Sequence, residues 1–330
     1  MNIVTALNKK YIPYTAVMLA SLGQNNTNEQ IEVFLLNSEL SEDDIRDMNE
    51  KIPCDNIILH SVPVDRSLFD DRLPHNDQWS IETYYRLMML ELLPKEVGRA
   101  LYLDGDMIVN KPLDELYNMP FDGNDIIACD DKGGLNLAER YGEKHNEMFK
   151  EAYEHGFRYF NAGVMVLNIE QMRENYSFDT YLDAIRAWNY EMEAPDQDIL
   201  NWVHLGKVGY ADHIVYDLFA RAAHNAKITY EVVKEGVAII HYAGAKPWNN
   251  ESVHFDIEKI WWEYAKKTGY YNELMEDFVN SAMADTTVEN YIEFLINSKN
   301  EMEIALEKAS AALRSFASLG AGGGSERDTV

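Results

Sequence analysis

Two aspartates separated by one glycine form the pair of side chains best suited to hold a metal ion. Asp104, Gly105 and Asp106 directly follow the apolar run at residues 100–103. In an extended chain the two carboxylates point to the same side, and the glycine lets the backbone turn closely around an ion. Carboxylate oxygens that face one point suit Mn²⁺ or Mg²⁺. A chain rich in aspartate also produces such triplets by chance, so a solvated turn is the alternative interpretation.

A second group of candidate residues follows the apolar run at residues 237–242. His241 lies at its carboxyl end and could add an imidazole ligand, which favours Mn²⁺ over Mg²⁺. Lys246 follows in a loop that contains Gly244 and Pro247, and its ammonium group could meet a phosphate as a point charge. The structural alternative is a buried, hydrogen-bonded histidine and a surface lysine.

Polar side chains at two further segment boundaries could contact a substrate. Asn161 stands at the entrance to the apolar run at residues 163–167, and its amide can both donate to and accept from sugar hydroxyls. A structural turn explains Asn161 equally well. Further along, Asp196, Gln197 and Asp198 precede an expected helix, so either aspartate could instead cap that helix.

Two more segments could belong to a nucleotide site. Arg86 lies in the helix expected at residues 81–93 and could reach a diphosphate. The loop after the first expected strand, residues 2–6, contains Asn8 and Tyr11, and in this topology such a loop commonly holds a base or ribose. No Gly-x-Gly-x-x-Gly motif and no P-loop lysine follows that strand, which argues against a dinucleotide or P-loop site.

The elements that must position these side chains alternate along the chain. Apolar runs of strand length lie at residues 2–6, 32–36, 56–60, 100–103, 126–129, 163–167 and 237–242. Amphipathic segments of helix length lie at residues 14–22, 42–51 (capped by Ser41), 81–93 and 178–190. This alternation predicts an α/β fold with a largely parallel sheet, in which ligands bind beyond the carboxyl ends of the strands.

The pattern becomes helical after about residue 270, so we expect a main domain at 1–270 and a helical extension at 271–319. Thr286 and Glu289 have capping-box spacing. Six small or apolar residues then share one face: Val288, Tyr291, Leu295, Met302, Ala305 and Ala309. The favoured interpretation is a helix packed on the main domain, and the alternative is an interface in a homo-oligomer. The glycine-rich residues 320–330 are expected to form a disordered tail.

Composition excludes several classes of function. The 330 residues include 29 basic and 56 acidic side chains, for a formal charge of −27, and 46% are hydrophobic. The hydrophobic content argues against disorder, and the charge argues against nucleic acid or an anionic membrane as a partner. An anionic substrate would therefore need a local reversal of sign, such as a divalent cation. Only two cysteines, and no signal or membrane-spanning segment, favour a soluble cytoplasmic protein.

Together these segments resemble the retaining glycosyltransferases of family 8, which include bacterial lipopolysaccharide galactosyl- and glucosyltransferases and glycogenin. The resemblance covers about residues 1–270 and implies a GT-A fold, a UDP-sugar donor and Mn²⁺, with Mg²⁺ as a substitute. It rests on five ordered blocks: Ile3-Val4-Thr5-Ala6; Tyr85-Arg86-Leu87; Leu103-Asp104-Gly105-Asp106; Phe160-Asn161-Ala162-Gly163 with Asp196-Gln197-Asp198; and His241-Tyr242-Ala243-Gly244 with Lys246-Pro247-Trp248.

The resemblance also implies a role for each matching residue. Asp104, Asp106 and His241 would bind the metal, and Asp196 and Gln197 would lie at the transferred sugar. The implied donor-binding residues are Ala6, Asn8, Tyr11, Arg86, Asp104, Gly105, Asn161, Gly244 and Lys246. This chain departs from the family pattern twice. One residue separates Gly244 from Lys246 where relatives usually have two, and Asn8 stands where relatives often have aspartate.

The implied reaction is hexose transfer to a hydroxyl of a glycan or glycolipid. Gln197 is a poor nucleophile, so the interpretation is attack by the acceptor from the face that the diphosphate leaves. A lipid-linked acceptor would place the protein at the inner face of the membrane, and the aromatic residues at 261–271 could then rest on the interface, although core packing of these rings is favoured. The alternatives are a sugar nucleotidyltransferase and a nucleotide-sugar-binding protein without turnover.

Overall fold

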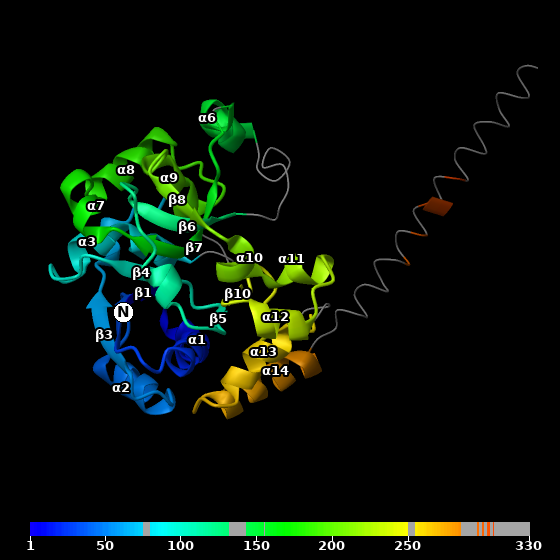
Figure 1. The fold of residues 1–330 in the computed structure, drawn as a ribbon. Helices are drawn as coiled ribbons and strands as arrows, with labels where there is room; N and C mark the ends of the chain where they lie inside the picture. The colour runs from blue at the N-terminus through cyan, green and yellow to red at the C-terminus, as the bar shows by residue number, and fades with distance from the viewer. Residues whose placement is uncertain are drawn as a thin grey trace, which may run out of the picture. The chain divides into compact units, whose positions relative to one another are not determined.

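The computed structural model describes residues 1–74, 80–131, 143–154, 156–249 and 255–284, and five single helical residues beyond them (Figure 1). The chain divides into two compact units, Met1–Phe278 and Val279–Val330. All the candidate site residues lie in the first unit.

The first unit is built around a seven-stranded sheet with the order β3-β2-β1-β4-β7-β6-β8. Its strands are β1 (Asn2–Ala6), β2 (Ile31–Asn37), β3 (Ile57–Pro63), β4 (Ala100–Leu103), β6 (Ile126–Asp130), β7 (Phe160–Leu167) and β8 (Val208–Ala211). Neighbouring strands are parallel except at β7, which runs antiparallel to both β4 and β6. The predicted α/β fold with a mixed, mostly parallel sheet is therefore confirmed.

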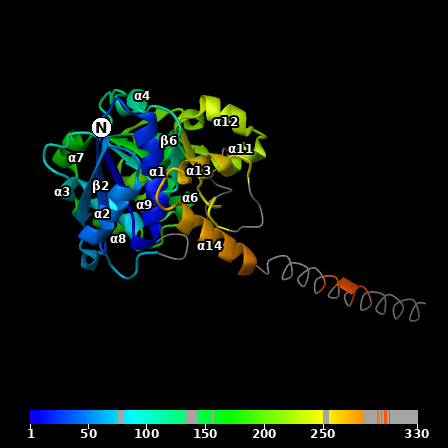
Figure 2. The same cartoon turned by 90° about the horizontal axis from the view of Figure 1, so that it is seen from below.

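Helices cover both faces of this sheet, because alternate residues of each strand point to opposite sides. Ile3 and Leu101 pack in one hydrophobic core with α1 (Ile12–Asn25) and α13 (Glu258–Ala265). The neighbouring residues of the same strands face a second core, which contains side chains of α7 (Ile169–Asn175), α8 (Phe178–Ala187) and α9 (Pro195–Val203). Figure 1 shows α7, α8 and α9 together on one side, and Figure 2 shows α1 and α13 from below.

Further helices complete the described part of the chain. They are η1 (Lys9–Tyr11), α2 (Glu42–Lys51), η2 (Arg66–Leu68), η3 (Ile81–Met88), α3 (Met89–Leu92), α4 (Asp114–Tyr117), α6 (Glu143–Glu154), α10 (His213–Tyr216), α11 (Ala220–Asn225) and α12 (Tyr230–Gly236), followed by the longer α14 (Tyr271–Ala284). Among them α2 matches the predicted bounds, and Ser41 caps it through a capping box with Asp44.

A small second sheet brings distant segments to the carboxyl end of β4. Its order is β5 (Met107–Val109), β10 (Ile239–His241) and β9 (Leu218–Phe219). His241 lies opposite Met107 on one side and opposite Phe219 on the other. The register therefore fixes the histidine beside the chain that leaves Asp106. The sequence pattern predicts β10 but neither β5 nor β9, because strands of two or three residues carry no detectable alternation.

Two predicted helices differ from the structure. The helix expected at residues 81–93 is a 3-10 helix over Ile81–Met88 that continues as a single α-turn over Met89–Leu92. Three residues per turn place Thr83 directly below Arg86 on the face toward the sheet. The helix expected at residues 178–190 ends at Ala187, because Asn189 and Tyr190 take left-handed backbone angles with φ of 53° and 60°.

Most of the expected C-terminal extension lies outside the described residues. This includes Thr286, Glu289 and every member of the predicted helical face except Met302, as well as the expected tail at 320–330. Within the described part, Ile296, Lys299, Met302, Glu303 and Leu306 are helical. None of the helices described is long and apolar enough to cross a membrane. Trp261, Tyr264 and Tyr270 are buried, so these aromatic residues pack in the core.

Candidate active site

Two carboxylates and one imidazole converge where β4, β5 and β10 meet. Each of Asp104, Asp106 and His241 offers a ligand atom, and these atoms lie within 4.8 Å of one another. The backbone holds this geometry, since the amide of Asp104 donates to the Gly163 carbonyl and the amide of Tyr242 donates to the Asp106 carbonyl, both at 3.0 Å. The structure thus brings together the three side chains that the sequence nominated as metal ligands.

Gly105 sits between the two aspartates in close contact with α1. A Cβ atom at this position would lie 2.7 Å from Oγ1 of Thr15. A side chain at this position would have to displace the Thr15 hydroxyl, so the glycine serves packing as well as the turn.

The convergent group fits a divalent cation. The side chain of Asp106 is nearly buried, and none of the described residues gives its Oδ1 a hydrogen bond. This oxygen lies 3.4 Å from Nε2 of His241. An unsatisfied buried carboxylate oxygen is costly unless a ligand completes it. Two carboxylates with one imidazole form a donor set that suits Mn²⁺.

Positive side chains offset the charge of Asp106. Lys246 forms an ion pair with Oδ2 of Asp106 and donates to the Tyr242 carbonyl at 3.1 Å. Burial alone would raise the pKa of Asp106, but Lys246 and His241 hold that pKa well below its usual range. For His241, burial favours the neutral ring, yet Asp106 and Asp217 raise its pKa to about 10.

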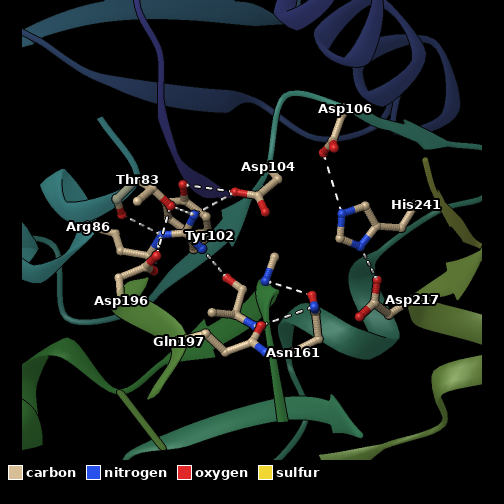
Figure 3. A network of polar contacts seen from close by, with 12 residues as sticks. Thr83, Arg86, Tyr102, Asp104, Asp106, Asn161, Asp196, Gln197, Asp217 and His241 are labelled. Carbon is tan, nitrogen blue, oxygen red and sulfur yellow. Dashed lines mark hydrogen bonds and ion pairs between the residues drawn. The ribbon is translucent and has the colours of Figure 1, made fainter. Parts of the chain in front are cut away.

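Arg86 lies between Asp104 and Asp196, as Figure 3 shows. Its guanidinium donates to Oδ1 of Asp104 at 2.9 Å and to the Ala162 carbonyl at 2.5 Å. It also forms an ion pair with Oδ2 of Asp196 at 2.9 Å, while Oγ1 of Thr83 donates to the other carboxylate oxygen. With 6% of its side chain exposed, Arg86 is buried between the two aspartates that it contacts.

The amide groups of Asn161 and Gln197 form one hydrogen-bonded unit next to this network. Nδ2 of Asn161 and the backbone amide of Ala162 both donate to Oε1 of Gln197, at 3.1 and 2.9 Å. Nε2 of Gln197 donates to Asp131 at 2.8 Å. The structure therefore places Gln197 and Asn161 together, beside the Asp196–Arg86 pair.

Neither aspartate of this segment is the N-cap of α9, because the cap position belongs to Ala194 and Pro195 follows it. Asp198 instead accepts bonds from the backbone amides of Glu193 and Ala194, at 2.9 and 3.0 Å. The capping interpretation is therefore wrong, and the carboxylate fixes the chain that leads into the helix.

The rings of Tyr11, Tyr14 and Trp248 form an aromatic wall beside the loop that follows β1. Asn8 caps η1 by accepting from the amide of Tyr11, and its Nδ2 donates to Glu82 at 3.4 Å. The ring of Tyr11 meets Tyr14 edge to face at 5.5 Å, and Tyr14 stacks on Trp248 at 4.1 Å. Burial raises the pKa of Tyr11.

Two remaining predicted positions lie at the ends of neighbouring segments. Ala6 is the last residue of β1, where the chain turns toward Asn8. Gly244 has a φ of +86°, the left-handed region that favours glycine, and the Arg221 guanidinium lies near it. The short Gly244–Lys246 spacing still lets the lysine reach Asp106.

The sequence reasoning missed Asp217 and the role of Gly163. Asp217 accepts a hydrogen bond from Nδ1 of His241 at 2.8 Å. A Cβ atom on Gly163 would lie 2.8 Å from Cε1 of His241, so the bare backbone makes room for the ring. Asp217 belongs to no recognisable motif. The only sequence feature that could have pointed to it is its place next to the apolar pair Leu218 and Phe219.

Sequence and structure comparisons relate this chain to known proteins. The family described as glycosyl transferase family 8 matches residues 2–252. A glycosyltransferase of Haemophilus influenzae, whose function is named only provisionally, is 27% identical over 258 residues, which cover 78% of this chain and 75% of the relative. The lipopolysaccharide 1,2-glucosyltransferase of Escherichia coli is 22% identical over 262 residues, which cover 76% of this chain and 73% of the relative.

Among solved structures, the galactosyltransferase LgtC in complex with donor and acceptor sugar analogues is similar to this chain. It has a TM-score of 0.66 and 25% sequence identity, and the alignment covers 82% of this chain and 96% of LgtC. The glycosyltransferase GlyE of Streptococcus pneumoniae has a TM-score of 0.60 over 85% of this chain and 64% of its own, at 20% identity. The first match supports the GT-A fold together with the family, and the second supports the fold alone.

Proposed function

Since this chain belongs to glycosyltransferase family 8, we propose that it moves a hexose, glucose or galactose, from a UDP-sugar to a hydroxyl of a glycan or glycolipid, with retention at the anomeric carbon. The observation that carries the proposal is the convergence of Asp104, Asp106 and His241 within 4.8 Å, beside Lys246. Although the chain carries a net negative charge, Lys246 and a bound cation would make this site locally suitable for a diphosphate.

The departing diphosphate concentrates negative charge, and the site is arranged to offset it. Asp104, Asp106 and His241 would hold Mn²⁺, or Mg²⁺ in its place, and the bound ion would supply Lewis-acid stabilisation of that charge. Lys246 adds an ammonium group on the same side, fixed by Asp106 and by the Tyr242 carbonyl. Charge that is placed before the reaction lowers the barrier most where new charge develops.

The residues that would contact the transferred hexose are better suited to orient it than to attack it covalently. Both ends of the Gln197 amide are engaged, one by Asn161 and Ala162 and the other by Asp131. Asp196 is buried and paired with Arg86 and Thr83. We therefore propose that these groups orient the hexose while the acceptor hydroxyl attacks from the face that UDP leaves. The acceptor proton passes to the departing phosphate oxygen, and the acceptor oxygen replaces that oxygen on the anomeric carbon.

The base would lie against the aromatic wall formed by Tyr11, Tyr14 and Trp248. Oδ1 of Asn8 already accepts from the amide of Tyr11, and its second lone pair can accept from the N3–H of uracil. Both cysteines, Cys54 and Cys129, are free thiols, which supports a reducing, cytoplasmic location. A lipid-linked acceptor would bring the protein to the inner face of the membrane.

The proposal is tested by measuring UDP release from UDP-glucose, UDP-galactose and UDP-N-acetylglucosamine, with Mn²⁺ and with a chelator. We expect release from one hexose donor that depends on the metal and rises with a suitable acceptor, and a product whose anomeric configuration by NMR matches the donor. Pyrophosphate release from UTP and a sugar phosphate would instead identify a nucleotidyltransferase. Tight UDP-sugar binding with no release over hours would identify a binding protein.

A further inference from the structure

We propose that Asp217 is a positioning residue that fixes the orientation and tautomer of His241, so that Nε2 of the imidazole faces the cation. The inference rests on the proposed function, because it assigns a role within the same metal site. Asp217 touches neither the cation nor the substrate, and it acts through the histidine. Figure 3 shows Asp217, His241 and Asp106 in one line, with the imidazole between the two carboxylates.

The imidazole ring is restrained on three sides. Nδ1 lies 2.8 Å from Oδ1 of Asp217. The Phe219 ring stands perpendicular to the imidazole at 5.1 Å. On a third side, Cε1 packs so closely over Gly163 that a Cβ there would approach it to 2.8 Å. The atom left over is Nε2, which faces Asp106 at 3.4 Å.

The hydrogen bond to Asp217 selects one tautomer of the neutral ring. An imidazole that donates its Nδ1–H keeps the lone pair on Nε2, and only that lone pair can bind a cation at this position. A carboxylate that accepts from the distal nitrogen also makes the ligating nitrogen more basic. In the other tautomer a proton would stand between Nε2 and the cation.

The surroundings of Asp217 direct its charge at the histidine. Its side chain is fully buried, with 0% exposed, so it cannot turn to solvent. Its Oδ2 receives no hydrogen bond within the part of the chain that the structure describes. The residue directly precedes β9, and β9 pairs with β10 in the register that places Phe219 opposite His241. Strand pairing therefore sets the distance between the carboxylate and the imidazole.

A second buried pair provides a matched control. Nδ1 of His204 lies 3.0 Å from Oδ2 of Asp125, and both side chains are almost fully buried. Asp125 directly precedes β6, so it lies at the amino-terminal end of this strand, whereas the candidate metal ligands Asp104 and Asp106 follow the carboxyl end of β4. Asp125→Asn thus makes the same chemical change as Asp217→Asn in a similar environment, at a distance from the candidate site.

The test measures the affinity of the full chain for Mn²⁺, without substrate, from the electron paramagnetic resonance signal of the free ion. We expect Asp217→Asn to bind Mn²⁺ about 10- to 100-fold more weakly than the unmodified chain, while Asp125→Asn binds it within about twofold. Circular dichroism and thermal melting report whether each variant folds. The variant Asp217→Glu, which keeps the charge on a longer side chain, should recover part of the affinity.

Combining Asp217→Asn with His241→Ala separates positioning from a general structural effect. If Asp217 acts through the imidazole, adding Asp217→Asn to His241→Ala changes the Mn²⁺ affinity no further. An equal loss in both backgrounds, or an affinity unchanged by Asp217→Asn alone, would overturn the assignment and leave the proposed function standing. A failure of the unmodified chain to bind Mn²⁺ would overturn the metal site itself and the proposed function with it.

Discussion

Two buried histidines in this molecule each contact an aspartate through Nδ1, but their Nε2 atoms have different surroundings. Nδ1 of His241 meets Asp217 at 2.8 Å, and Nδ1 of His204 meets Asp125 at 3.0 Å. Nε2 of His204 then meets the Tyr181 hydroxyl at 3.0 Å, so both nitrogens of that ring are satisfied by the protein. The far nitrogen of His241 instead faces Asp106, whose nearest oxygen lacks a donor among the described residues.

The two aspartates, Asp125 and Asp217, also differ in how many hydrogen bonds they accept. Asp125 also accepts from the Tyr176 hydroxyl and from Nε2 of Gln171, both at 2.7 Å, whereas Oδ2 of Asp217 receives nothing from the residues that are described. A buried histidine with an acidic partner is therefore not in itself a sign of a binding site. The difference lies in whether the network closes on protein groups or leaves an atom for a ligand. We call these the open pair (Asp217 and His241) and the closed pair (Asp125 and His204).

The largest effect is expected when Asp106, the acidic residue that the open pair faces, loses its charge. We expect Asp106→Asn to reduce metal-dependent UDP release on the order of 10³-fold, because the neutral amide is a weak ligand and no longer balances Lys246. Initial rates at saturating donor measure this. Asp114→Asn, an exposed change on α4, is the control, and a loss of less than tenfold in Asp106→Asn would argue against the open pair as a metal site.

Breaking the closed pair should affect stability alone. His204→Ala leaves Asp125 buried without its imidazole and deprives the Tyr181 hydroxyl of its partner, so we expect the free energy of unfolding to fall by about 3 kcal/mol. Urea denaturation measures this change. The affinity for Mn²⁺, corrected for the folded fraction, should stay within twofold. A large loss of affinity at full folding would show that the two pairs are coupled.

A smaller effect is expected from crowding the imidazole of the open pair. In Gly163→Ala the new methyl group would press on Cε1 of His241 and on Oδ1 of Asn161, each at 2.8 Å. The ring must move, and we expect Mn²⁺ affinity to fall about tenfold. Gly209→Ala on β8 is the matched change, because its Cβ would meet its nearest neighbours at 3.4 Å. Equal affinities for both variants would show that the ring is not held by this contact.

A separate effect concerns the pH dependence of the metal-free protein. The pKa of His241 is raised from 6.5 to about 10, so the folded chain holds this proton more tightly than the unfolded chain. The resulting stabilisation is complete below about pH 6.5 and is lost as the pH rises through about 10. We expect urea titrations to show that the free energy of unfolding falls between pH 7 and 10. His241→Gln should abolish this part of the dependence, and an unchanged slope would contradict it.

The sequence marked Asp104, Asp106 and His241 individually as candidate ligands at strand ends, and the family resemblance joined them into one set. Asp104, Asp106 and His241 each follow or end an apolar run, but the small second sheet that brings His241 to the two aspartates is not visible in the alternation. The structure adds what alternation does not encode. The strand β7 runs antiparallel, and this reversal places the Gly163 carbonyl against the Asp104 amide.

Tertiary contacts account for the other differences. Arg86 stays a predicted donor-binding residue, and nothing local in the sequence indicates that its guanidinium is buried between Asp104 and Asp196. Asp217 is invisible in the sequence because its role arises from the pairing of β9 with β10, and β9 has only two residues. A side chain that acts through a neighbour leaves no spacing pattern of its own.

The order of the site residues along the chain has a consequence for biosynthesis. Asp106 and Lys246 lie 140 positions apart although their side chains are paired. At ordinary rates of translation the acidic half of the site leaves the ribosome on the order of ten seconds before its basic partners. Until β10 joins β5, the two aspartates have neither the imidazole nor the ammonium group beside them. A nascent chain therefore cannot pair Asp106 with His241 and Lys246 until both of these residues have left the ribosome.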